Sequence, residues 1–135
     1  MRDVEIRANA IRKGPHGTWA VRYLEDAAEE RTICGHRRRL LSNGDGTNAF
    51  AHLVRIYDAE PHYHKVATEL YYVVEGRGTM TLDGEEIELK PGACVEVKPG
   101  VVHAAKGGVL VLVVGVPSIS EDDTFFPAGD GVSGS

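Results

Sequence analysis

Two histidines one residue apart, with a glutamate five residues further on, are the side chains in this sequence most suited to chemistry. His62 and His64 have the i, i+2 spacing that places two side chains on one face of a β-strand. The four residues KVAT, between His64 and Glu69, can turn the chain so that the apolar segment ELYYVVEG runs back beside the histidines. Two imidazoles and a carboxylate on adjacent strands can hold a divalent transition-metal ion.

A fourth ligand has to come from elsewhere, and His103 is the best candidate among the remaining histidines. It directly follows the turn sequence KPGVV and begins a predicted strand. His16 and His36 lie in segments that we expect to be connecting or exposed. His52 shares the strand parity of Phe50 and therefore points inward, either as a hydrogen-bonded core histidine or as a partner of a metal ligand.

The spacing of these residues resembles the two sequence motifs of the cupin superfamily. The first cupin motif reads His-x-His, four residues, Glu, six residues, Gly. His62, His64, Glu69 and Gly76 match this motif at every step. Only the short segment 77–91 separates it from the second motif, as in small bacterial cupins.

The second cupin motif reads Gly, five residues, Pro-x-Gly, two residues, His, three residues, Asn. The chain matches it at Gly92, Gly100 and His103. Lys98 stands where the proline is usual, with Pro99 one position later, and Gly107 replaces the final asparagine. Both departures affect turn geometry and leave the side chains that would face a metal unchanged.

The resemblance extends from about Asn48 to Val116 and implies an all-β fold, a single-domain cupin-type jelly-roll barrel with one metal ion inside. By likeness to the family, the ligands would be His62, His64, Glu69 and His103. In octahedral coordination such a ligand set would leave two positions for water, dioxygen or a chelating substrate. Iron or manganese suits that chemistry best, and nickel, zinc or copper are possible with the same ligands.

The elements that must position these residues are predicted to be short strands, because β-type segments recur between turn residues and helical spacing is almost absent. Asp83-Gly84 is the strongest hairpin signal, since a type I′ turn needs positive φ at both central residues. Many short strands with almost no helix favour a sandwich or barrel independently of the resemblance. The predicted strands cover residues 18–24, 31–41, 48–58, 69–75, 78–82, 85–89, 93–98, 103–105 and 109–116.

Composition and charge narrow the domain organisation and the partners. The chain has 135 residues, of which 42% are hydrophobic, and this suits one domain, predicted over residues 1–126 with N-terminal strands included. The Gly/Ser-rich stretch 127–135 is predicted to be a flexible tail. The net charge of −5 gives no electrostatic reason to expect nucleic acid or an anionic membrane as a partner.

The remaining sequence features favour a cytoplasmic protein. The first residues contain no apolar signal segment, and the longest apolar run, VLVLVVGVP, is too short to span a bilayer. Cys34 and Cys94 lie among apolar residues and are predicted to be buried free thiols. The basic run 37–39 is predicted to be solvated on a strand or loop.

A metal site of this kind is compatible with three functions. The first is an enzyme, for which we favour a dioxygenase acting on a small enolic, phenolic or keto-acid substrate. The second is a metal-dependent isomerase, lyase or decarboxylase; a version acting on sugar phosphates would need cationic groups inside the barrel, where we expect none. The third is a cupin that binds a small molecule without turnover.

Tyr71 is the one candidate catalytic residue besides the metal ligands. It shares strand parity with Glu69 and should point into the barrel, where its hydroxyl could orient a substrate or donate a proton. The alternative is a core aromatic whose hydroxyl binds a backbone carbonyl. Arg55 and Tyr57 have the parity opposite to Ile56 and are expected on the outer face; an inward Arg55 would instead anchor an anionic substrate.

A homodimer is predicted from the edges of the fold. A small two-sheet structure leaves outer strands unpaired, and natural proteins cover such edges. Trp19, Val21 and Tyr23 alternate along an N-terminal strand and could pack against a second subunit. Similar small cupins are commonly dimers.

Overall fold

The computed structural model describes residues 9–119 and 121–127, and it consists mainly of antiparallel strands. The strands are β1 (Arg12–Lys13), β2 (Ala20–Val21), β3 (Glu29–Thr32), β4 (Gly35–Leu41), β5 (Phe50–Asp58), β6 (Thr68–Glu75), β7 (Gly78–Leu82), β8 (Glu85–Leu89), β9 (Cys94–Val97) and β10 (His103–Val116). Single 3-10 turns lie between or after them as η2 (Pro15–Gly17), η3 (Leu24–Asp26), η4 (Asn43–Asp45) and η5 (Glu121–Asp123). No helix in these two ranges is long and apolar enough to cross a membrane.

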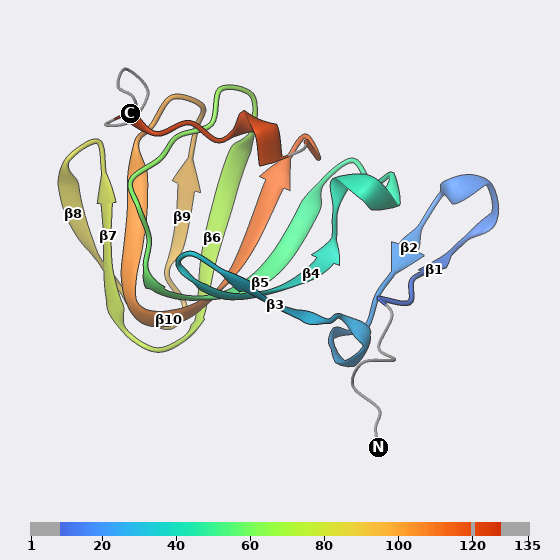
Figure 1. Ribbon diagram of the computed structural model, residues 1–135. Coiled ribbons are helices and arrows are strands. Elements are labelled where there is room, and N and C mark those ends of the chain that lie inside the picture. The colour runs from blue at the N-terminus through green and yellow to red at the C-terminus, as the bar shows by residue number, and fades with distance from the viewer. Residues whose placement is uncertain (1–8, 120, 128–135) are drawn as a thin grey trace.

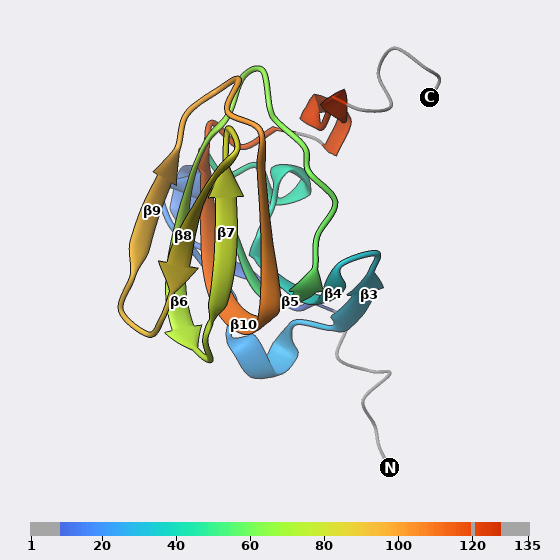
Figure 2. The same ribbon diagram turned by 90° about the vertical axis from the view of Figure 1, so that its left-hand side faces the viewer.

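The strands roll into a cupin-type jelly roll, with the long strand β10 shared between its two sides (Figures 1 and 2). One side has the strand order β3-β4-β5-β10-β6-β9, and β7 pairs with both β8 and β10. Residues 103–106 of β10 pair with β7, whereas residues 109–116 lie between β5 and β6. The first half of β10 therefore belongs to one side of the roll and the second half to the other.

The change of partner along β10 occurs at Gly107 and Gly108. Both residues have positive φ, 114° and 82°, which only glycine adopts readily. A Cβ atom at Gly107 would lie 2.6 Å from the Cα atom of Gly78, so the two backbones need this close approach. The sequence prediction of a turn between strands 103–105 and 109–116 is wrong, because the glycines form a bulge within one continuous strand.

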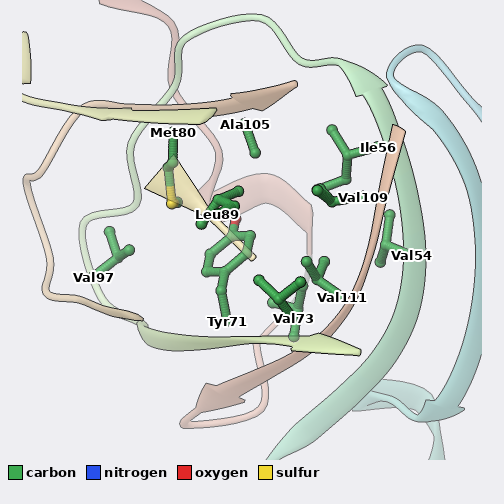
Figure 3. Close-up of a cluster of buried hydrophobic side chains, with 11 residues drawn as sticks. Val54, Ile56, Tyr71, Val73, Met80, Leu89, Val97, Ala105, Val109 and Val111 are labelled. Atoms are coloured by element: carbon green, nitrogen blue, oxygen red, sulfur yellow. The ribbon is translucent and has the colours of Figure 1, made fainter. Parts of the chain in front are cut away.

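The core lies between the two sides of the roll (Figure 3). Met80 of β7 and Ala105 of β10 face Tyr71 and Val73 of β6 across it, and β5 contributes further apolar side chains. Along β6 the side chains alternate, with Glu69, Tyr71 and Val73 buried and Leu70, Tyr72 and Val74 exposed. This alternation confirms the predicted inward direction of Tyr71 and turns the carboxylate of Glu69 towards the interior.

The N-terminal third differs most from the sequence prediction. The strand predicted over 18–24 is reduced to the two residues of β2, which pairs with β1 in a hairpin that stands away from the roll (Figure 1). The strand predicted over 31–41 is a hairpin of β3 and β4. Its turn, Ile33-Cys34, contains no glycine, proline or asparagine, and it closes because the Thr32 hydroxyl accepts a hydrogen bond from Gly35 N–H at 3.0 Å.

The rest of the strand pattern agrees closely with prediction. Strands β7 and β8 have the predicted bounds, and the turn between them places Asp83 and Gly84 at φ of 50° and 89°, as a type I′ turn requires. Cys94 was predicted to be buried but is exposed, because Val95 takes the inward position on β9. Cys34 is partly buried. Of the predicted tail 127–135, residues 128–135 lie outside the described residues.

Candidate metal centre

Three histidines converge at one end of the roll. Ring nitrogens of His62, His64 and His103 lie within 4.8 Å of one another. His62 and His103 exchange two backbone hydrogen bonds of 3.1 and 2.8 Å, which hold the segment before β6 against the first residue of β10. His62 and His64 do not lie in a regular strand as predicted, but His62 and Tyr63 make isolated bridges that keep the segment extended.

The backbone fixes the orientation of all three imidazoles. The Nδ1 atoms of His62, His64 and His103 lie 2.8, 2.8 and 2.9 Å from the carbonyl oxygens of Glu60, Asp123 and Val101, in that order. A carbonyl oxygen only accepts hydrogen bonds, so each Nδ1 carries the proton and donates it. In a neutral imidazole the Nε2 atom then presents its lone pair, which is the form that binds a metal ion.

Glu69 brings a carboxylate to the same point. Its Oε1 atom lies 3.2 Å from His64 Nε2 and 3.3 Å from His103 Nε2, and it accepts a hydrogen bond of 3.1 Å from the Tyr71 hydroxyl. Burial alone would raise the pKa of Glu69, but its interactions with His103 and His64 outweigh burial and hold that pKa well below its usual range. The buried carboxylate is therefore negatively charged.

The four side chains fit a divalent transition-metal ion. The Nε2 atoms of His64 and His103 are buried and make no hydrogen bond with a protein group, although Glu69 Oε1 lies close to both. Two Nε2 lone pairs that face a carboxylate oxygen repel it unless a proton or a metal cation lies among them. Three imidazole nitrogens and one carboxylate oxygen are a donor set that suits iron, manganese, nickel, zinc or copper.

The surroundings affect the histidines unequally. Burial lowers the pKa of His62, and the neighbouring His103 lowers it further. Burial also disfavours the charged form of His64, but Glu69 more than compensates and raises the pKa of His64 above its ordinary value. The carboxylate thus favours a positive charge on the side of the cluster nearest to it.

The segment after β10 secures the histidine segment, and nothing in the sequence pattern indicated this contact. Asp123 Oδ1 accepts hydrogen bonds from the backbone N–H groups of Lys65 and Val66 at 2.9 and 3.2 Å. Its Oδ2 atom accepts from Val66 and Ala67 at 3.0 and 3.1 Å. These donors oppose the effect of partial burial and lower the pKa of the Asp123 carboxyl group. One residue therefore ties down the loop between two candidate ligands and also orients His64.

A pocket of about 400 Å³ lies beside the histidine cluster, with His62, His64 and Glu69 in its wall. Arg37 and Arg39 line it as well. The prediction of an interior without cationic groups is therefore wrong, and the arginine run, predicted to be solvated on a strand or loop, lies partly buried on β4. Strand register explains the difference, and it could not be inferred from a run of three identical residues.

The η4 turn also lines the pocket, and its residues Asn43 and Gly44 are exposed. Ser42 and Asp45 form a capping box across this turn. The guanidinium of Arg22 binds both carboxylate oxygens of Asp45, at 2.8 and 3.0 Å. This pair holds the pKa of Asp45 down to about 2, mainly through the Arg22 hydrogen bond.

The other predicted residues lie as follows. Tyr71 is 6% exposed, and its hydroxyl donates to Glu69 and not to a backbone carbonyl. Burial and the negative charge of Glu69 raise the pKa of Tyr71 well above its usual value. Arg55 is on the outer face as predicted, bound to Gly108 and Glu75. His52 points inward as predicted and lines the pocket.

The central part of the chain matches a known family. Residues 56–114 match the family model described as the cupin domain. An uncharacterized protein of Methanocaldococcus jannaschii and the quercetin 2,3-dioxygenase of Bacillus subtilis are each 55% identical to this chain over 31 residues, or 23% of it. That stretch is 25% of the first protein and 9% of the second, so the chain spans a small part of these relatives.

A solved structure agrees with the fold. The crystal structure of a protein from Planctomyces limnophilus is similar with a TM-score of 0.72 and 24% identity, over 77% of this chain and 93% of that one. This similarity bears on the fold alone. The family match and the jelly roll agree on one conclusion, that residues 56–114 of this chain form a cupin domain.

Proposed function

We propose that this cupin binds one divalent transition-metal ion through His62, His64, Glu69 and His103 and uses it in catalysis. The observation that carries the proposal is the convergence of three imidazoles whose Nδ1 protons all go to backbone carbonyls, with Glu69 Oε1 beside two of the Nε2 atoms. Iron and manganese are the favoured ions, because open coordination positions and accessible redox states suit small organic substrates and dioxygen.

The reaction we favour is the dioxygenation of a small enolic, phenolic or keto-acid substrate. When bound, an iron or manganese ion would supply Lewis acidity and one-electron chemistry. The pocket would hold the substrate next to the ion, with Phe50 and Ile119 giving it apolar wall. Tyr71 would orient the Glu69 carboxylate through its hydroxyl and keep a proton close to the site. The short match to a quercetin 2,3-dioxygenase supports this choice.

A metal-dependent isomerase, lyase or decarboxylase is the second candidate. Arg37 and Arg39 line the pocket, and this supplies the cationic groups that such chemistry on an anionic substrate needs. Binding of a small molecule without turnover is the third candidate. Oxygen consumption separates the first function from the other two, and product formation without oxygen separates the second from the third.

The test is metal analysis of protein purified without added metal, followed by aerobic and anaerobic assays of the same sample with enolic, phenolic and keto acids. We expect about one iron or manganese ion per chain and oxygen uptake with a subset of these compounds. His64→Ala should lose the metal, whereas His16→Asn, a change at an exposed histidine outside the site, should keep it. Full metal content in His64→Ala would contradict the ligand assignment.

We also propose that the protein is a cytoplasmic homodimer. Both cysteines are free thiols, which suits a reducing compartment. Leu70, Tyr72 and Val74 form an exposed apolar row on β6, and Trp19 and Tyr23 are exposed near the N-terminal hairpin, so a second subunit would bury substantial apolar surface. A monomer mass in light scattering would reject the dimer, and recovery in a non-cytoplasmic fraction would reject the location.

A further inference from the structure

We propose that Arg37 and Arg39 form a carboxylate-binding subsite in the pocket beside the metal centre, so that the substrate of this cupin is a small organic acid. The proposal deepens the proposed function, since the subsite would hold the acid group while another part of the molecule reaches the metal. It follows from strand register, from a shared carboxylate contact and from the charges that line the pocket.

Strand register places two of the three consecutive arginines inside. Directly paired residues of antiparallel strands point to the same face, and Arg37 pairs with Val54 while Arg39 pairs with His52. Val54 belongs to the core and His52 lines the pocket. Arg38 has the opposite parity, and its guanidinium donates to the backbone carbonyl of Ala27 at 3.2 Å. The pocket wall therefore receives Arg37 and Arg39 but not Arg38.

The two inward guanidiniums are held together by one carboxylate. Glu30, which pairs with Arg37 across the β3–β4 hairpin, accepts hydrogen bonds from Arg37 Nε and from Arg39 Nε, each at 3.0 Å, on the same oxygen, Oε1. Partial burial raises the pKa of Glu30, but the two arginines outweigh it and lower that pKa. The spacing of the guanidiniums thus already matches one carboxylate group.

The charges that line the pocket favour an anion. Arg37 and Arg39 bring two guanidinium groups to its wall, and both donate to the Glu30 carboxylate. Among the described residues of the pocket wall, the other charged side chain is Glu69, which contacts the histidines of the metal centre. Planar guanidinium forks match the geometry of a carboxylate. The pocket of about 400 Å³ suits a small molecule that reaches from the arginines towards the metal centre.

The test compares Arg37→Gln and Arg39→Gln with the matched control Arg38→Gln, which removes the same charge from the other face of β4. The probes are benzoate and 2-oxobutanoate, their neutral amides, and inorganic phosphate, titrated calorimetrically into the metal-loaded and the metal-free protein. Each inward variant should bind the carboxylates about 10- to 100-fold more weakly, as expected for the loss of a charged hydrogen bond. Arg38→Gln should bind them as wild type does, and the amides should bind more weakly than the acids in wild type.

Metal content, measured on every variant, separates this proposal from the proposed function. Absence of metal from the wild type with carboxylate binding intact would contradict the function and leave the subsite supported. Unchanged carboxylate binding in both inward variants, or no binding of either acid by the wild type, would overturn the subsite. Tighter binding of phosphate than of carboxylate would overturn the substrate class. If a glutamine variant fails to fold, Arg39→Lys, which keeps the charge but loses the fork, should still weaken carboxylate binding.

Discussion

Asp123→Asn tests how the proposed metal centre is supported without changing any of its proposed ligands. In the wild type, the two carboxylate oxygens accept four backbone contacts from three consecutive residues, Lys65, Val66 and Ala67. Asparagine has the same shape but keeps only one acceptor oxygen, and its amide NH₂ must face backbone donors whichever way it turns. The substitution therefore removes two contacts and the negative charge while the backbone carbonyl that binds His64 remains.

The expected magnitude follows from those contacts. A hydrogen bond to a charged group contributes about 1.5–3 kcal/mol, and the value lies at the low end here because Lys65 and Val66 are exposed and regain water. We expect the free energy of unfolding to fall by about 2 kcal/mol. Because the Asp123 backbone is anchored by its own side chain, the His64 imidazole also loses orientation, and metal affinity should fall about 10- to 100-fold.

The assay has two readouts on the same samples. Urea unfolding gives the change in stability, and competition with a chelator of known affinity gives the metal dissociation constant. Asp58→Asn, which removes the same charge at an exposed position outside the loop, should change neither by a measurable amount. A variant that loses stability but binds metal as tightly as wild type would refute the inference that Asp123 positions His64.

Three further predictions concern other parts of the molecule. The pKa of Asp45 lies at about 2 in the folded protein and near 3.8 in the unfolded chain. The Arg22–Asp45 pair should therefore add about 1 kcal/mol to the free energy of unfolding above pH 4, and this contribution should disappear towards pH 2. The difference in free energy of unfolding between wild type and Asp45→Asn, followed against pH, measures the contribution. Constancy of that difference from pH 7 to pH 2 would contradict it. Gly107→Ala should destabilise the protein by more than about 1 kcal/mol in urea unfolding, because the bulge at this residue needs a positive φ and close backbone contact. A variant as stable as wild type would contradict the bulge. Tyr71→Phe should lower turnover more than metal content, because only the hydroxyl bound to Glu69 is lost; wild-type turnover would remove Tyr71 from the mechanism.

Most of the strands and the shared direction of His62 and His64 could be predicted because they depend on local rules, whereas the place of His103 beside them was predicted from the resemblance to the cupin motifs. The alternation of side chains along a strand predicted which residues of β6 point inward. The positive φ angles of Asp83 and Gly84 follow from the type of turn that this residue pair forms. The i, i+2 spacing of His62 and His64 brought both imidazoles to the cluster even though the segment is an isolated bridge and not a strand. Such features need only neighbouring residues.

The features that were missed depend on contacts between distant segments. Asp123 lies 59 positions after His64 and carries no motif that ties it to the histidine loop. The inward direction of Arg37 and Arg39 depends on the pairing of β4 with β5, which has an irregularity between Arg39 and Leu41. One residue of slip in that register would reverse every side chain of the strand. Parity alone therefore could not assign the arginines to the pocket.

The measurement that tests the metal centre most directly is a titration of the metal-free protein with Co²⁺, followed by calorimetry and by visible absorption. Wild type should bind one ion per chain, and His103→Ala should weaken that binding at least 100-fold, because the substitution removes one of three converged imidazoles. His16→Asn should bind as wild type does. Equal binding of Co²⁺ by wild type and His103→Ala would contradict a metal centre at this place in the fold.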